Sequence, residues 1–133
     1  MSSPKAPFGM HLLADLYGIS AARLRDGAAL ESLLRTAALA AGATVLGSHF
    51  HRFGGDLGVT GVVLLAESHI SIHTWPESAF AAVDLYLCGS DPDRALKVLT
   101  DALEPAHRRT RRATRGLNAD ADQRRGRRNR RPW

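Results

Sequence analysis

Residues 59–77 read VTGVVLLAESHISIHTWPE, and this stretch predicts two neighbouring strands of one sheet. Residues 59–67 are apolar and rich in β-branched side chains, which is typical of a central strand. In residues 68–76 isoleucine alternates with serine and histidine, and Pro76 ends the run. The bond between Glu67 and Ser68 therefore lies at or near the turn that joins two buried strands.

Further elements extend on both sides of this pair. Ser20 is a candidate N-cap, Asp26-Gly27 divides an opening turn from the main helix, and Gly42 is a plausible stop. The spacing of apolar residues predicts strands over 10–18, 43–53 and 79–89, and helices over 21–42 and 91–104.

The element order is therefore β-α-β-β-β-β-α, with short connections in the middle of the chain. Short connections between strands favour a largely antiparallel sheet. Two helices on one face of that sheet give a two-layer α/β sandwich of the α+β class. The other sheet face then needs cover, for which a second copy of the chain is a candidate.

Charge divides the 133 residues into two parts. Residues 1–104 contain seven basic and eleven acidic side chains, whereas residues 105–133 contain eleven arginines and two aspartates. The C-terminal segment has almost no apolar periodicity, so we expect a folded domain over 1–104 and a disordered Arg-rich tail over 105–133. Such a tail can also contact nucleic acid or another polyanion without sequence specificity.

Cysteine content and hydropathy exclude two further classes of protein. Cys88 is the single cysteine, which excludes an internal disulfide framework and fits a reducing compartment. No charged-then-apolar leader opens the sequence, and no apolar run approaches the ~20 residues of a membrane span. We therefore expect a soluble cytoplasmic protein with no membrane contact.

Ser68 carries the chemistry that this region suggests. A strained peptide bond before Ser68 would place its hydroxyl close to the carbonyl of Glu67. Attack by Oγ on that carbonyl is an N→O acyl shift, and β-elimination of the resulting ester splits the chain. A metal site is the alternative from residue types alone, since imidazoles and a thiol bind zinc or iron; the candidate ligands are His49, His51, His69, His73 and Cys88.

Several motifs together resemble the prokaryotic S-adenosylmethionine decarboxylase family. Its signature around the processed serine is close to ESHxxIHTWPE, and this chain has ESHISIHTWPE over 67–77. Three further segments match in order and spacing: MHLLADLYG at 10–18, GATVLGSHFHRF followed by GVTGVVLLAESH, and AAVDLYLCG at 81–89. The resemblance covers residues 9 to about 103 and leaves little room for the metal alternative.

The resemblance implies a proenzyme that cleaves itself between Glu67 and Ser68 into a β chain, 1–67, and an α chain, 68–133. Ser68 would become a pyruvoyl group, which forms a Schiff base with the substrate amine and takes up the electrons released by decarboxylation. No metal and no pyridoxal phosphate are implied. The family also implies a homodimer of processed protomers, (αβ)₂, with active sites near the interface.

Other roles follow from the family motifs. His73 would transfer protons during processing, and Cys88 would reprotonate the substrate carbon. Thr60 stands where the family usually has serine and would assist processing. The substrate would be held by three residues: Phe53, which stacks on adenine, Glu67 and Glu77.

Three segments near the expected pocket depart from the family pattern. FGGDLG at 53–58 replaces a segment resembling FxPYG, SAF follows WPE, and leucine precedes the cysteine in LYLCG. S-adenosyl-L-methionine, whose product supports spermidine biosynthesis, is the expected substrate. Because Asp56 in the altered loop could pair with a distal cation, L-ornithine or L-arginine is an alternative. A non-catalytic binding module with a polyanion-binding tail is the remaining alternative.

Overall fold

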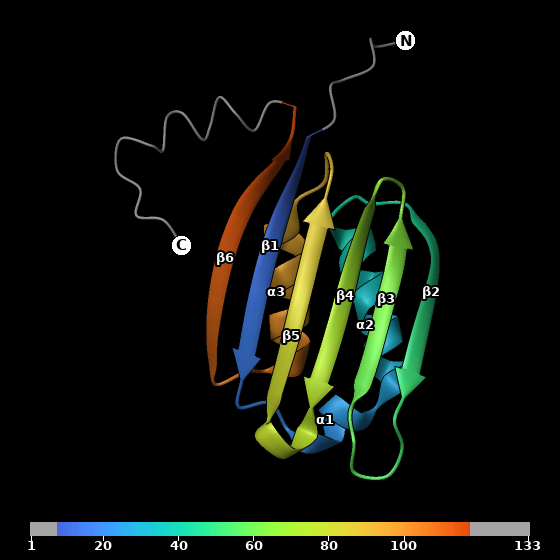
Figure 1. Cartoon of the computed structure of the whole chain (residues 1–133), viewed down its shortest axis with the longest axis vertical. Helices are drawn as coiled ribbons and strands as arrows, with labels where there is room; N and C mark the ends of the chain where they lie inside the picture. Colours follow the sequence, from blue (N-terminus) through green and yellow to red (C-terminus); the bar gives the residue numbers. More distant parts are fainter. Residues whose placement is uncertain (1–7, 118–133) are drawn as a thin grey trace.

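The computed structural model describes residues 8–117, which form one sheet with helices packed on a single face (Figure 1). The strands are β1 (Phe8–Tyr17), β2 (Val45–Arg52), β3 (Val59–Leu65), β4 (Ser68–Trp75), β5 (Phe80–Leu87) and β6 (His107–Gly116). The helices are α1 (Ala21–Arg25), α2 (Gly27–Ala40) and α3 (Pro92–Leu103), with a short 3₁₀ turn, η1, at Pro76–Ser78.

The sheet order is β2-β3-β4-β5-β1-β6, and every neighbouring pair is antiparallel. β3, β4 and β5 form a meander because only two to four residues join each strand to the next. β1 then pairs with β5, so the N-terminal strand lies inside the sheet and not at its edge. The predicted α+β sandwich with a largely antiparallel sheet is confirmed.

The helices begin and end where the sequence predicted. The Ser20 hydroxyl accepts a hydrogen bond from the Arg23 N–H at 3.3 Å, and Asp26 caps α2 by accepting from the Ala29 N–H at 3.0 Å. Gly42, just after α2, has a φ of +86°, which glycine adopts without steric cost. No helix within residues 8–117 combines the length and the apolar character needed to cross a membrane.

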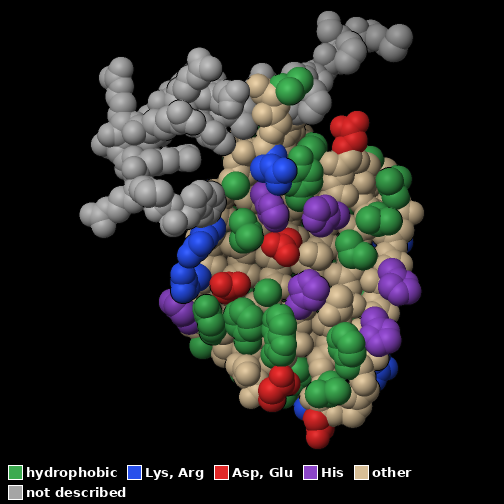
Figure 2. Space-filling model, in the orientation of Figure 1, with side chains coloured by type: hydrophobic (Ala, Val, Ile, Leu, Met, Phe, Trp, Pro, Cys, Tyr) green, Lys and Arg blue, Asp and Glu red, His purple; other side chains and the backbone are tan. Residues whose placement is uncertain are grey.

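The core lies between the helices and one face of the sheet. Alternate residues of β1, β3, β4 and β5 point toward α2 and α3, as the period of two requires. Large fully buried side chains on this face include Leu12, Leu16, Ile70, Ile72 and Leu85, which meet Leu30, Leu34 and Leu99 from the helices. The other face of the sheet carries no helix, and we call it the open face (Figure 2).

The expected disorder of residues 105–133 is wrong for residues 107–116, which form the edge strand β6. β6 pairs with β1 along its whole length, so the sheet has one strand more than expected. None of its residues is buried, and the side chain of Arg112 forms an ion pair with Asp93 of α3. An exposed edge strand is held by backbone hydrogen bonds and needs no apolar periodicity, so the sequence pattern did not reveal it. Residues 118–133 of the expected tail lie outside the described residues.

Thr74 is the one polar residue in the core among residues 8–117, and 6% of its surface is exposed. Its hydroxyl accepts a hydrogen bond from the Val59 N–H at 2.8 Å and donates one to the Leu24 carbonyl at 2.7 Å. The single side chain thereby links β4, β3 and α1.

We expect Thr74→Val to lower the free energy of unfolding by about 1–3 kcal/mol, because two buried backbone groups lose their partner while the shape is kept. Chemical denaturation at fixed protein concentration measures this difference. Thr36→Val on the exposed side of α2 is the control and should change stability by less than about 0.5 kcal/mol. Equal stability of the two variants would contradict the linking role.

Candidate active site

Glu67 has an unusual backbone conformation at the predicted cleavage point. The chain passes from β3 through Ala66 and Glu67 directly into β4, and Glu67 has a φ of +60°. Non-glycine residues reach this left-handed region at a cost of about 1–3 kcal/mol. The Ala66 N–H donates to the Thr44 carbonyl at 3.0 Å, which anchors the turn to the start of β2. The left-handed backbone conformation therefore lies at Glu67, the residue predicted to supply the scissile carbonyl.

Ser68 and Cys88 lie side by side at this end of the sheet. Ser68 opens β4, Cys88 follows the last residue of β5, and the Cys88 N–H donates to Ser68 Oγ at 2.9 Å. Cys88 is partly exposed. Within residues 8–117, the Ser68 hydroxyl has no histidine or carboxylate as a hydrogen-bond partner.

Tyr86 lies on the open face beside Cys88 and was not predicted from the sequence. A hydrogen bond with the Cys88 side chain raises the pKa of Tyr86, and burial and the negative charge of an ionised Cys88 raise it further. The phenol consequently keeps its proton near neutral pH. Its ring stacks on His69 with centroids 5.7 Å apart. The signal in the sequence was the period of two, which places Tyr86 and Cys88 on one face.

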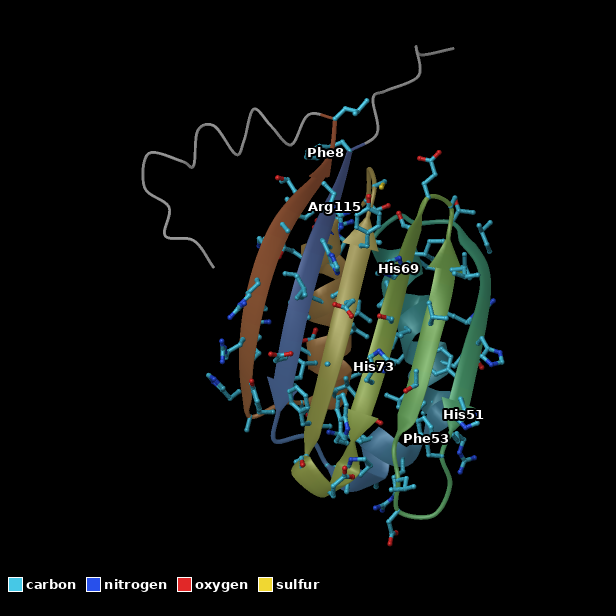
Figure 3. The ribbon with its side chains drawn as sticks, viewed as in Figure 1. Phe8, His51, Phe53, His69, His73 and Arg115 are labelled. Atoms are coloured by element: carbon cyan, nitrogen blue, oxygen red, sulfur yellow. The ribbon has the colours of Figure 1, made fainter. Side chains whose placement is uncertain are left out.

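A second group of predicted residues lies toward the opposite end of the sheet (Figure 3). Thr60 Oγ1 of β3 is 3.2 Å from His73 Nδ1 of β4, which is hydrogen-bonding distance. Both line a cavity of about 370 Å³ together with Phe53, Leu57, Trp75 and Glu77. The Phe53 ring is 56% exposed, so its face is available to a ligand.

The two groups cannot meet within one chain. Ser68 and His73 are five residues apart on one extended strand, and at about 3.3 Å per residue this separates them by about 16 Å. Ser68 opens the strand, and its Oγ is directed at the neighbouring chain segment after β5, where it accepts a hydrogen bond from the Cys88 N–H. The structure thus joins Ser68 with Cys88, and Thr60 with His73, Phe53 and Glu77. We call these the serine half-site and the histidine half-site.

Asp56 belongs to neither half-site. It is exposed in the turn between β2 and β3, and it does not line the cavity to which Phe53 and Leu57 contribute. His49 and His51 lie on β2, and His69 lies on β4 next to Ser68. Among residues 8–117, no three His, Cys, Asp or Glu side chains are arranged to hold a metal ion.

Comparison with known proteins places this geometry in a family. A family model described as S-adenosylmethionine decarboxylase matches residues 10–116. The chain belongs to the S-adenosylmethionine decarboxylase family. It is 53% identical over 97 residues to the S-adenosylmethionine decarboxylase proenzyme of Parasynechococcus marenigrum, covering 71% of this chain and 75% of that protein. It is 42% identical over 111 residues to the proenzyme of Caldicellulosiruptor saccharolyticus, covering 82% and 89%.

A solved structure agrees with this assignment. The crystal structure of the adenosylmethionine decarboxylase from Aquifex aeolicus is similar with a TM-score of 0.76 and 42% identity, covering 86% of this chain and 94% of that one. The resemblance seen in the sequence is confirmed, and the chain is a member of a family of decarboxylase proenzymes. The family match extends to residue 116, so β6 lies within the family domain.

Proposed function

We propose that the chain cleaves itself between Glu67 and Ser68, giving a β chain of residues 1–67 and an α chain of residues 68–133, and then decarboxylates S-adenosyl-L-methionine. The observation that carries this proposal is the left-handed Glu67 directly before Ser68, whose Oγ accepts a hydrogen bond from the backbone N–H of Cys88. In a member of this decarboxylase family, that arrangement joins a strained carbonyl, an adjacent nucleophile and a candidate proton donor.

Processing needs no reactant other than water. Ser68 Oγ attacks the Glu67 carbonyl, its proton passes to a base, and the Glu67–Ser68 C–N bond breaks to leave an ester and a free amine. Loss of the Ser68 α-proton eliminates the Glu67 carboxylate and leaves dehydroalanine. Its imine tautomer takes up water and releases ammonia, which leaves a terminal pyruvoyl group. Cleavage of the turn also releases the left-handed strain at Glu67.

The surroundings of Ser68 fit such a group. Ser68 begins β4, so after cleavage it becomes the first residue of the α chain. Cys88 lies next to it, directly after β5. A pyruvoyl group supplies an electron sink for decarboxylation of an amino acid. Cys88 is proposed to return the proton to the substrate carbon. Tyr86, whose pKa is raised by the neighbouring Cys88 side chain, is proposed to orient the thiol.

We further propose that a homodimer, (αβ)₂, completes each active site. Among residues 8–117, no histidine or carboxylate is hydrogen-bonded to Ser68, while the Thr60–His73 pair lies by the cavity of Phe53 and Glu77. The open face extends from one end of the sheet to the other. It carries exposed apolar side chains, among them Leu13, Leu64 and Trp75. Pairing of two open faces related by twofold symmetry would place one chain's histidine half-site against the other's serine half-site.

The histidine half-site favours S-adenosyl-L-methionine over a basic amino acid. Phe53 and Trp75, which are 56% and 42% exposed, offer aromatic surface for an adenine ring, and Glu77 offers a carboxylate toward a cationic substrate. Asp56, the feature that suggested L-ornithine or L-arginine, does not line this cavity. The product of the proposed reaction is the aminopropyl donor of spermidine synthesis.

The test is release of labelled carbon dioxide from each carboxyl-labelled substrate by the purified protein, with mass spectrometry of the α chain. We expect release from S-adenosyl-L-methionine and a pyruvoyl group at residue 68. Release from ornithine or arginine alone would agree with the pyruvoyl mechanism but would contradict S-adenosyl-L-methionine as the substrate. An uncut chain with a serine at residue 68 and full turnover would overturn the mechanism.

Family membership weighs against the alternative of a non-catalytic binding module. Contact with a polyanion stays a prediction, now concerning the exposed arginines of β6 as well as the residues beyond it. A cytoplasmic location likewise stays a prediction.

A further inference from the structure

Arg115 of β6 lies at the same end of the sheet as the serine half-site (Figure 3). β6 and β1 pair Arg115 with Gly9, and β1 and β5 pair Met10 with Leu87. Continuing that register by one residue puts Gly9 opposite Cys88, so Arg115, Gly9 and Cys88 form one row across three strands. Neighbouring strands are about 4.8 Å apart, so the backbones of Arg115 and Cys88 are separated by about 10 Å.

Gly9 leaves the middle of this row without a side chain. The Tyr86 ring occupies the space above it, because a Cβ built on Gly9 would lie 2.7 Å from the Tyr86 ring and hydroxyl. Tyr86 thus lies over Gly9, between Cys88 and Arg115 in this row. The Arg115 charge acts on Tyr86 and lowers its pKa, against the larger effect of the hydrogen bond with Cys88.

Within the part of the chain that the structure describes, the guanidinium of Arg115 has no carboxylate partner. Two arginines form ion pairs within residues 8–117, Arg23 and Arg112. Arg115 forms none there. The next row on the open face contains Ala113, His11, Tyr86 and His69, so Arg115 is the one lysine or arginine in the two rows beside Cys88. Its side chain is exposed.

We propose that Arg115 binds the α-carboxylate of the substrate and so orients the substrate at the serine half-site. This inference rests on the proposed function, which brings an amino acid to residue 68. The α-carboxylate is the one anionic group of S-adenosyl-L-methionine, and it is equally present in ornithine and arginine. A guanidinium fork matches a carboxylate by two parallel hydrogen bonds, which fix direction as well as position.

The chemistry limits what Arg115 can contribute. The carboxylate loses its negative charge when carbon dioxide leaves, so a guanidinium that held it tightly throughout would stabilise the substrate more than the transition state. Arg115 therefore acts as a positioning and specificity residue whose effect is on substrate binding. Its loss should change KM more than kcat, and it should leave affinity for the decarboxylated product unchanged.

The experiment compares Arg115→Met with the control Arg111→Met. Arg111 lies on the same strand and the same face as Arg115, opposite Leu13 of β1, so the control removes an equal charge. Both variants should process fully on a gel. For Arg115→Met we expect KM for the substrate to rise about 10–100-fold, the effect of one charge-assisted contact, with kcat within about threefold. Affinity for decarboxylated S-adenosylmethionine should match that of the unsubstituted enzyme, and Arg115→Lys should restore part of KM. Arg111→Met should leave KM, kcat and the affinity for decarboxylated S-adenosylmethionine unchanged.

An unchanged KM in processed Arg115→Met would overturn the inference. So would equal losses of affinity for substrate and product, since these would indicate a structural role. Failure of the proposed function is separately visible: it is the absence of carbon dioxide release from the unsubstituted protein. Should that protein decarboxylate ornithine or arginine, the same KM ratio is measured with that substrate.

Discussion

Ser68→Ala should give a single uncut chain with no decarboxylase activity. Alanine keeps the backbone of β4 but removes the oxygen that attacks the Glu67 carbonyl, so neither the ester nor the pyruvoyl group can form. Turnover should fall to the uncatalysed rate, a loss of about 10⁶-fold or more for an enzyme of typical power. A denaturing gel and labelled carbon dioxide release measure the two effects in one preparation.

Ser71→Ala is the matched control. Ser71 lies three residues along the same strand, on the open face, where its hydroxyl donates to Asp84 at 3.3 Å. That variant should be cleaved and should decarboxylate its substrate at close to the normal rate. If Ser68→Ala were cleaved like the unsubstituted protein, the assignment of the scissile bond would be wrong.

A Ser68→Ala chain should restore the processing of a His73→Ala chain when the two share a dimer. His73→Ala alone should process about 10²–10⁴-fold more slowly, since it lacks the proposed base, and Ser68→Ala alone cannot process. In a mixed dimer, the intact Glu67–Ser68 of the first chain faces the intact His73 of the second. With equal amounts and random pairing, about half of the His73→Ala chains should be cleaved.

Co-expression with two different tags, followed by a gel that resolves both chains, measures this rescue. The control pairs His73→Ala with a chain that carries both Ser68→Ala and His73→Ala, which cannot supply a base. No cleavage in the first mixture, or rapid cleavage of His73→Ala by itself, would show that each chain completes its own site. That result would contradict the separation of the half-sites along β4.

Local patterns predicted most of the fold correctly. The alternation in residues 68–76 identified β4 and its buried face, and the capping residues Ser20 and Gly42 marked the helix limits. These predictions succeeded because each depends on neighbours within a few positions along the chain. β6 was missed because its stability comes from pairing with β1, 90 to 108 residues earlier in the chain, and none of its own residues is buried.

The residues of the candidate site divide in the same way. The sequence by itself determined that a glutamate, a serine, a histidine and a cysteine stand in the order and spacing of one decarboxylase family. Only the tertiary structure decided which of them lie together, because strand pairing joins Ser68 with Cys88 across β4 and β5. It also separates both from His73, since an extended strand carries residues five positions apart to opposite ends of the sheet. Pairing of β6 with β1, likewise invisible in local periodicity, brings Arg115 to the serine half-site.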